Sequence, residues 1–261
     1  MEFDIESFPQ CSSRELHVWR VDLDHPAVAI GVLGEFLSPE ERQRAARFLR
    51  DTDRQRFIVG HSALRTILGR YLGVSPGRVE ITDRPDGKPQ LLPSPTVSPL
   101  RFNLSHSEGL ALVAVALDRE VGIDVERVRP LADVENIVER YFAPGERGKW
   151  QALPDHERLA AFFRCWTRKE AYLKACGTGL SLGLDRFEVS FAPGEPARLL
   201  WCGDANDTSA QWIVYDVSPS RSYMAACVVE VGIEMVSIYD WPAFFASPRG
   251  RELAPSNLPA P

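Results

Sequence analysis

The chain has 261 residues, of which 44% are hydrophobic and 25% charged, and its formal net charge is −6. This composition is typical of a globular protein with one large or two modest domains, and the acidity excludes a global basic field that would attract nucleic acid or an anionic membrane. The five cysteines show no CxxC spacing, which indicates reduced thiols. With an acidic N-terminus and no long apolar run, we expect a soluble, cytoplasmic protein without a membrane span.

The first third of the chain predicts a strand followed by two helices. Residues 16–22 alternate as a strand does. The segment SPEERQRAARFLRD then begins a helix, with Ser38 as N-cap, Pro39 at the first position and Glu41 completing a capping box. Residues at helical spacing predict a second helix that ends before Gly73: Phe57, His61, Leu64, Leu68 and Leu72.

Short strands follow, and the order of elements then recurs. VEIT (79–82), the turn RPDGKPQLL, the strand–turn–strand segment FNLSHSEGLALVAVAL and the extended VGIDVE precede a helix over 159–176 and four more strand-like runs. VEI and GKP match FEV and GEP at a spacing of 107 to 108 residues. The repeat predicts an α+β fold of two pseudo-symmetric halves, each a small antiparallel sheet packed with helices. We expect halves at 1–118 and 119–240 and a Pro-rich tail at 241–261.

The extended segment GIDVE carries two carboxylates on one side. In a strand Asp124 and Glu126 project together, and we expect Ile123 and Val125 to turn toward the core. The pair has the form of a magnesium site that shares its ligands with substrate phosphates. A solvated strand edge is the alternative.

The segment FNLSHS suggests an anion-binding turn. Ser105 and His106 are expected in a polar turn between strands, where hydroxyl and imidazole groups reach an anion. No G-x-S-x-G elbow surrounds Ser105, so a hydrolase triad is excluded there. An ordinary polar turn is the alternative.

Basic residues near the first helices are further anion-binding candidates. Arginine offers planar, bidentate donors for phosphate, although most of these side chains should only be solvated. The candidates are Arg42, Arg44, Arg47, Arg50, Arg54 and Arg56. We expect one or two of these six to touch a ligand. Lys88, in DGKP, is either a ligand contact or a turn lysine in water.

The helix WTRKEAYLKACGTGL carries Glu170 and Lys174 one turn apart and ends at Gly177. Phe163 and Thr167 continue the same stripe. The pair is either a common surface ion pair or part of a site for phosphate and metal.

Together and in this order, GKP, FNLSHS, GIDVE and WTRKEAYLKACGTGL resemble the 4′-phosphopantetheinyl transferases. The resemblance is to the larger, single-chain type that activates surfactin synthetase and related synthases, and it covers residues 36 to 230. It implies two pseudo-symmetric α+β halves with the site between them. The implied reaction moves the 4′-phosphopantetheine arm of coenzyme A onto a serine of a carrier protein and releases adenosine 3′,5′-bisphosphate.

The resemblance also implies roles for individual residues. Mg²⁺ would be held by two carboxylates from the strand at the join and one from a helix in the other half: Asp124, Glu126 and Glu170. Lys174 would stabilise charge on the transferring phosphate, and Glu170 would be the base, directly or through water. Coenzyme A would be bound by Asp124 and Lys174 and by contacts to its phosphates and adenosine end: Arg44, Arg56, Lys88, Ser105 and His106.

Two further positions can be compared with the family pattern, and one of them departs from it. Glu146, in YFAPGER, lies where the family has an acidic residue near the site. Glu41 stands where some relatives have lysine, so Arg42 or Arg44 would have to grip the 3′-phosphate instead.

The implied partners are coenzyme A and acyl, peptidyl or aryl carrier protein domains, with no nucleic acid, no membrane and a monomeric enzyme. Carrier proteins are acidic, so docking should use a local basic and apolar patch. Two alternatives remain. One is a binding module that lacks catalysis, and the other is a metal-dependent phosphodiesterase that removes the arm. The intact acidic set opposes the first, and the scattered histidines oppose the second.

Overall fold

The computed structural model describes residues 8–92, 100–177, 182–203 and 208–241. The chain forms small, mainly antiparallel sheets and helices, so the predicted α+β class is confirmed. Two units can be separated. Unit 1 consists of the described residues up to Thr82, of Pro89–Asp118 and of the residues from Glu234, and unit 2 consists of Asp83–Lys88 and Arg119–Ile233.

The sheet of unit 1 has four strands in the order β11-β1-β5-β4. Strand β1 pairs antiparallel with β5 and parallel with β11, and β4 pairs antiparallel with β5. The strands are β1 (Glu15–Asp22), β4 (Leu100–Ser107), β5 (Leu110–Leu117) and β11 (Met235–Trp241). A separate two-stranded sheet contains β2 (Ile81–Asp83) and β3 (Pro89–Leu91).

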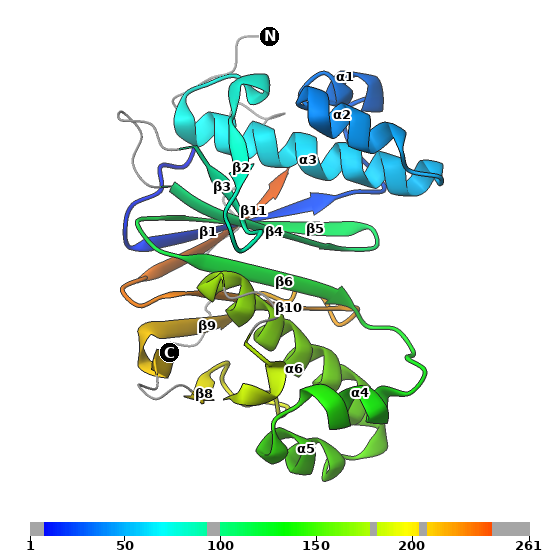
Figure 1. Ribbon diagram of the computed structural model, residues 1–261, viewed down its shortest axis with the longest axis vertical. Coiled ribbons are helices and arrows are strands. Elements are labelled where there is room, and N and C mark those ends of the chain that lie inside the picture. The colour runs from blue at the N-terminus through cyan, green and yellow to red at the C-terminus, as the bar shows by residue number, and fades with distance from the viewer. Residues whose placement is uncertain (1–7, 93–99, 178–181, 204–207, 242–261) are drawn as a thin grey trace. The chain divides into compact units, whose positions relative to one another are not determined.

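In unit 1 the start of one helix and the end of another lie where local signals predict, at Ser38 and Gly73. Short α1 (Ile30–Gly34) precedes α2 (Pro39–Ala46), whose N-terminus has the complete capping box of Ser38 and Glu41. Helix α3 (Asp51–Leu72) is followed by the left-handed Gly73 and the 3₁₀ turn η1 (Pro76–Arg78). Helix α3 runs along one face of the sheet (Figure 1) and packs on it through Val59, Ala63, Leu64, Ile67 and Leu68.

Unit 2 has a three-stranded antiparallel sheet in the order β6-β10-β9. Its strands are β6 (Val121–Arg127), β9 (Trp212–Asp216) and β10 (Tyr223–Glu230). A second pair is β7 (Phe187–Val189) with β8 (Leu199–Cys202). The helices are α4 (Val134–Tyr141), α5 (Pro144–Gln151) and α6 (Asp155–Cys176), with the 3₁₀ turns η3 (Leu184–Arg186) and η4 (Thr208–Gln211). None of the helices in the described parts of the chain is both long and apolar enough to cross a membrane.

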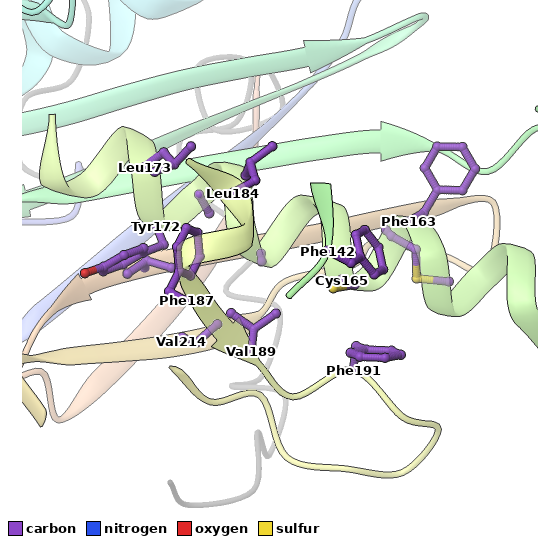
Figure 2. Packing of buried hydrophobic residues seen from close by; sticks show 14 of the residues in the cluster. Phe142, Phe163, Cys165, Tyr172, Leu173, Leu184, Phe187, Val189, Phe191 and Val214 are labelled. Atoms are coloured by element: carbon purple, nitrogen blue, oxygen red, sulfur yellow. The ribbon is translucent and has the colours of Figure 1, made fainter. Parts of the chain in front are cut away.

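Helix α6 forms the centre of the unit 2 core. Figure 2 shows Tyr172 beside Phe187, whose ring centroids are 4.8 Å apart, with Val214 below them. Phe142 and Phe162 stack at 5.7 Å, next to the buried Cys165. Helix α6 also packs against β10 and α5.

The internal repeat predicted from the sequence is visible in the two units. Each contains a strand, a 22-residue helix that ends at a left-handed glycine, a 3₁₀ turn, a two-stranded hairpin and two further strands. The strand order β1-β5-β4 in unit 1 matches β6-β10-β9 in unit 2. The units do not divide at one point, because Asp83–Lys88 belongs to unit 2 and β11 belongs to unit 1. Residues 242–261 of the expected tail lie outside the described residues.

Candidate active site

Strand β6 presents Gly122, Asp124 and Glu126 on one face. Their cross-strand partners on β10 belong to the unit 2 core under α6: Val228, Ala226 and Met224. Directly opposed residues share a face of a sheet, so the acidic face of β6 points toward α6. Ile123 and Val125 are buried on the opposite face. The expectation that Ile123 and Val125 turn toward the core is therefore confirmed.

A glycine brings this strand into backbone contact with α6. A Cβ atom at Gly122 would lie 2.2 Å from the carbonyl oxygen of Ala171 and 2.3 Å from the amide nitrogen of Ala175. No larger residue fits at this distance without moving the backbone. The small side chains of Ala171 and Ala175, one turn apart, allow the same approach from the helix.

The close approach places Lys174 on the strand. Its Nζ lies 2.6 Å from Oδ1 of Asp124 and donates more weakly, at 3.3 Å, to the carbonyl oxygen of Ile123. The Asp124 side chain is 7% exposed and that of Lys174 is 30% exposed. Lys174 therefore does not serve only as a partner for Glu170 on the helix surface. Its ammonium links α6 to β6.

Glu170, one turn before Lys174, belongs to the same electrostatic group. Burial and then the charge of Asp124 raise the pKa of Glu170, the Lys174 ammonium lowers it, and Glu126 raises it further. Repulsion of this kind requires carboxylates that interact across the gap between strand and helix. All three lie in unit 2, so the expectation that Glu170 comes from the other half was wrong.

The three carboxylates fit a divalent cation in kind. Mg²⁺ prefers hard oxygen ligands, and a bound cation would relieve the repulsion between neighbouring carboxylates. Among the residues that the structure describes, however, no group of three acidic, histidine or cysteine side chains is gathered as a ready set of metal ligands. Lys174 contributes a positive charge beside Asp124. A single ion held by Asp124, Glu126 and Glu170 thus stays a prediction.

Four of the predicted coenzyme A contacts lie in unit 1. Ser105 and His106 belong to strand β4, with Ser105 buried and His106 exposed, so the predicted turn location was wrong. The turn itself lies at Glu108 and Gly109, because β4 continues to Ser107 and β5 begins at Leu110. Their contact with a ligand stays a prediction.

The two arginines of this set have different surroundings. Arg44 is exposed, and its guanidinium carbon lies 5.2 Å from the ring centroid of Phe57. Arg56 makes a two-point ion pair with Asp24, at 2.7 and 3.0 Å. Arg44 can therefore meet an anion directly, whereas Arg56 would first have to leave Asp24.

Lys88 is buried in unit 2 instead of pointing into water. Its Nζ lies 2.7 Å from Oε2 of Glu120 and 3.1 Å from the carbonyl oxygen of Ala175. The turn-lysine alternative is therefore wrong, and Lys88 has protein partners at the end of α6.

Glu41 has a structural role that explains its departure from the lysine of some relatives. Its carboxylate accepts hydrogen bonds from Ser38 N, His61 and Arg65. Burial alone would raise the pKa of Glu41, but these bonds outweigh burial and lower it to about 2. A lysine here would lose all three contacts.

Glu146 and Lys169 form a fully buried ion pair in unit 2. Lys169 Nζ lies 2.7 Å from Oε2 of Glu146 and donates to the carbonyl oxygens of Leu184 and Phe187. Burial raises the pKa of Glu146, and the Lys169 ammonium opposes this shift. The pair holds α6 to α5 and β7, so Glu146 is engaged in the core.

Sequence reasoning did not assign Lys169. A signal was present, because Lys169 occupies a buried position in the helical series Phe162, Cys165, Lys169 and Tyr172. A lysine at such a position needs a buried partner, and the partner is a glutamate 23 residues earlier that the spacing does not reveal.

Comparison with known proteins assigns this arrangement to a class. The model of the 4'-phosphopantetheinyl transferase superfamily matches residues 120–228, which include β6 and α6. A second model, described as the N-terminal part of 4'-phosphopantetheinyl transferase, matches residues 28–118.

Two relatives show how far the similarity extends. The chain is 42% identical over 217 residues to the 4'-phosphopantetheinyl transferase HetI of Nostoc sp., which covers 83% of this chain and 88% of HetI. It is 30% identical over 154 residues to the 4'-phosphopantetheinyl transferase Sfp of Bacillus subtilis, covering 59% of this chain and 66% of Sfp. The chain therefore belongs to the 4′-phosphopantetheinyl transferase superfamily and to its larger, Sfp-like type, and the predicted enzyme class is confirmed.

A solved structure also matches part of the chain. It is a holo-(acyl-carrier-protein) synthase from Bacillus anthracis in complex with CoA (3',5'-ADP), 28% identical, with a TM-score of 0.34. The match covers 42% of this chain and 94% of that protein.

Proposed function

We propose that this enzyme transfers the 4′-phosphopantetheine arm of coenzyme A to a serine hydroxyl of an apo carrier protein, in an Mg²⁺-dependent reaction that releases adenosine 3′,5′-bisphosphate. The observation that carries the proposal is the link between Asp124 and Lys174, with Glu126 and Glu170 in the same electrostatic group. This group lies within the part of the chain that the superfamily model matches.

In this proposal the carboxylates of Asp124, Glu126 and Glu170 hold Mg²⁺. The ion supplies Lewis-acid stabilisation of the anionic pyrophosphate when it is bound. Asp124 and Glu126 lie on one face of β6, and Glu170 lies on the adjacent helix α6. Each can therefore supply an oxygen donor from within unit 2.

Lys174 stabilises the charge that develops during transfer. The serine oxygen forms a bond to the phosphorus that carries the pantetheine arm, while the pyrophosphate P–O bond breaks and its electrons stay with adenosine 3′,5′-bisphosphate. Phosphoryl-type transfer depends mainly on positioning and electrostatic stabilisation. An ammonium held at β6 by Asp124 is placed on a rigid element for this task.

The serine proton must reach a base, and we assign this role to Glu170. The partner protein supplies the nucleophile, so this chain needs none of its own. Glu170 is half-buried on α6 beside Lys174, close enough to the acidic face of β6 to interact with Asp124 and Glu126.

The phosphates and adenosine end of coenzyme A are assigned to basic and polar side chains of unit 1: Arg44, Arg56, Ser105 and His106. Arg44 is the most accessible of the arginines in this set and can offer two donors to a phosphate. The acceptor is an acyl, peptidyl or aryl carrier protein domain.

Two alanine variants test the carboxylate assignment. With Mg²⁺, coenzyme A and apo carrier protein supplied, Asp124→Ala and Glu170→Ala should abolish the mass gain of about 340 Da, one pantetheine-phosphate arm. Glu139→Ala, which removes an exposed glutamate that pairs with Arg147 on the surface of unit 2, should keep full activity.

Full activity in either site variant would contradict the assignment. Separate incubations with apo and holo carrier distinguish the remaining possibilities. A mass loss from holo carrier would indicate a phosphodiesterase, and binding without any mass change would indicate a module that lacks catalysis.

Replacing Lys174 separates charge stabilisation from binding. Lys174→Ala should lower kcat more than it weakens coenzyme A binding, because the ammonium acts on charge that develops in the transition state. Lys174→Arg keeps a cation and serves as the matched control. A loss of coenzyme A affinity with unchanged kcat would make Lys174 a binding residue only.

A further inference from the structure

A network of charged side chains lies where β6 begins and α6 ends. Glu120 directly precedes β6, and its carboxylate accepts hydrogen bonds from Arg84 Nη1 at 3.1 and 3.2 Å and from Lys88 Nζ at 2.7 Å. Asp86 pairs with Arg84 at 3.3 Å. These residues all belong to unit 2.

Lys88 extends this network to the last turn of α6. Its side chain is 7% exposed, and its ammonium also donates to the carbonyl oxygen of Ala175, the residue after Lys174. The last four carbonyl groups of a helix have no partner within the helix, and a cation at this end is favourable for the helix dipole. Lys88 therefore caps the turn that carries Lys174.

The segment Arg84–Lys88 lies directly against the end of α6. A Cβ atom at Gly177 would lie 2.4 Å from Oδ2 of Asp86 and 3.3 Å from Nη2 of Arg84. Gly177 also has the left-handed φ of 68°. The glycine thus leaves room for the ends of the Asp86 and Arg84 side chains beside the helix end.

Glu120 is anchored to the sheet on its other side. Its backbone N–H donates to Oε2 of Glu230 at 2.8 Å, and the N–H of Glu230 donates to the carbonyl oxygen of Glu120 at 3.2 Å. The carboxylate that holds Lys88 and Arg84 is therefore fixed to the end of β10 as well as to β6.

We propose that Glu120 is a positioning residue for the Asp124–Lys174 pair and that Arg84 and Lys88 are the means by which it acts. The three side chains clamp the last turn of α6 to the start of β6. Gly122 and Asp124 follow Glu120 on β6, and Lys174 precedes the capped Ala175 on α6, so the network sets the spacing between the two sides of the pair. The inference rests on the proposed function.

Glu120 can be distinguished from a coenzyme A contact by its charge. A carboxylate repels the phosphates of coenzyme A, so loss of Glu120 would not weaken substrate binding by removing a direct contact. If Lys88 acted only as a phosphate ligand, removing its anionic partner would free it and improve binding. Positioning predicts the opposite pattern, in which turnover falls and coenzyme A binding changes little.

The test uses the full chain and the variants Glu120→Ala, Glu120→Gln and Lys88→Met. For Glu120→Ala we expect kcat to fall about 10-fold or more while KM for coenzyme A stays within about 2-fold, since small displacements of a reacting group are costly. Backbone amides at the end of α6, residues 174–177, should exchange with deuterium about 10-fold faster. Glu234→Ala, which removes an exposed ion pair with Arg14 in unit 1, should change neither quantity.

The double variant Glu120→Ala/Lys88→Met tests whether the two residues act as one unit. Its kcat should be no lower than that of the more impaired single variant. Glu120→Gln keeps the shape and one acceptor, so it should give an intermediate effect and remain folded even if Glu120→Ala does not.

An increase in KM for coenzyme A with unchanged kcat would overturn the proposal, and so would unchanged exchange at residues 174–177. Hydrogen exchange is measured without any carrier protein. If exchange rises in the Glu120 variants but the parent enzyme transfers no arm, the network holds the helix and the proposed function has failed instead.

Discussion

The two units use equivalent strand faces in opposite ways. The ladder β1–β5 matches β6–β10 residue for residue, so His17 corresponds to Gly122 and Trp19 to Asp124. In unit 1 this face is filled by large side chains: the hydroxyl of Tyr71 lies 2.6 Å from Nδ1 of His17 and accepts a hydrogen bond from Trp19 at 3.0 Å. In unit 2 the corresponding positions are small or acidic.

The two long helices show the same difference in side-chain size when their positions are aligned on the terminal glycines, Gly73 and Gly177. Tyr71 corresponds to Ala175, so a ring that separates helix from strand in unit 1 is a methyl group in unit 2. The backbones of β6 and α6 can then touch, and Lys174 reaches Asp124. The two units thus share one arrangement of strands and helix, and the candidate active site lies in the unit that lacks aromatic side chains at this contact.

One device is common to both copies. Arg65 in unit 1 and Lys169 in unit 2 occupy the same position before the terminal glycine, and each pairs with a glutamate at the third position of a preceding helix, Glu41 or Glu146. Both cations also donate to carbonyl oxygens just after their helix. This correspondence supports a structural role for Glu146.

The largest effect is expected from breaking the pair that is more deeply buried. Lys169→Met leaves Glu146 buried without its cation and should lower the free energy of unfolding by about 3–5 kcal/mol, measured by urea denaturation. Arg65→Met should cost less, because the Glu41 side chain remains 15% exposed and keeps its bond from His61. Equal losses in the two variants would show that the pairs do not differ in this way.

A pH-dependent loss of stability is expected from the aromatic face of unit 1. Burial lowers the pKa of His17 from its usual 6.5 to about 4, against the opposing charge of Glu15. Between these values the unfolded chain binds the proton first, so the free energy of unfolding falls as the pH drops through this window, by about 3 kcal/mol in all. Above pH 6.5 His17 contributes no pH dependence.

The comparison that isolates this group is with His17→Gln. Denaturation of both proteins at pH 7 and pH 4 cancels the contribution of the other titrating groups. The variant should lose less stability than the parent between the two pH values, and parallel losses would contradict the assignment.

A smaller stability effect, with a large effect on activity, is expected at the small-residue contact of unit 2. Gly122→Ala should cost roughly 1–3 kcal/mol as β6 and α6 are pushed apart, and it should lower kcat about 100-fold if Lys174 moves by about 1 Å. Gly148→Ala, in α5 where a Cβ atom meets nothing within 4 Å, is the matched control. Unchanged activity in Gly122→Ala would show that the pair tolerates a wider gap.

Local signals predicted much of the fold. The capping box at Ser38 and the glycine ends of the two long helices depend on residues within a few positions of one another, and both occur as expected. Strand alternation also placed Asp124 and Glu126 on one face. The alternation along a strand predicts that two residues share a face of the sheet, but it does not predict which face packs against the helix.

Pairings between residues far apart in the sequence could not be predicted from local signals. Strand β11 joins the sheet of unit 1 beside β1, and the ion pair between Arg20 and Asp240 spans 220 residues. The partner of Lys169 and the location of Ser105 on a strand likewise depend on what packs around them. Such contacts leave no regular spacing in the chain.

The sequence by itself determined the family, the α+β class, the repeat and the residue types of the site, because motifs, caps and periodicities are written in short stretches. Only the tertiary structure decided that Lys174 pairs with Asp124, that Lys88 caps α6 and that Glu146 lies in the core. The physical reason is that a charged side chain is assigned its partner by burial and by the distance between elements, and both are properties of the packed chain.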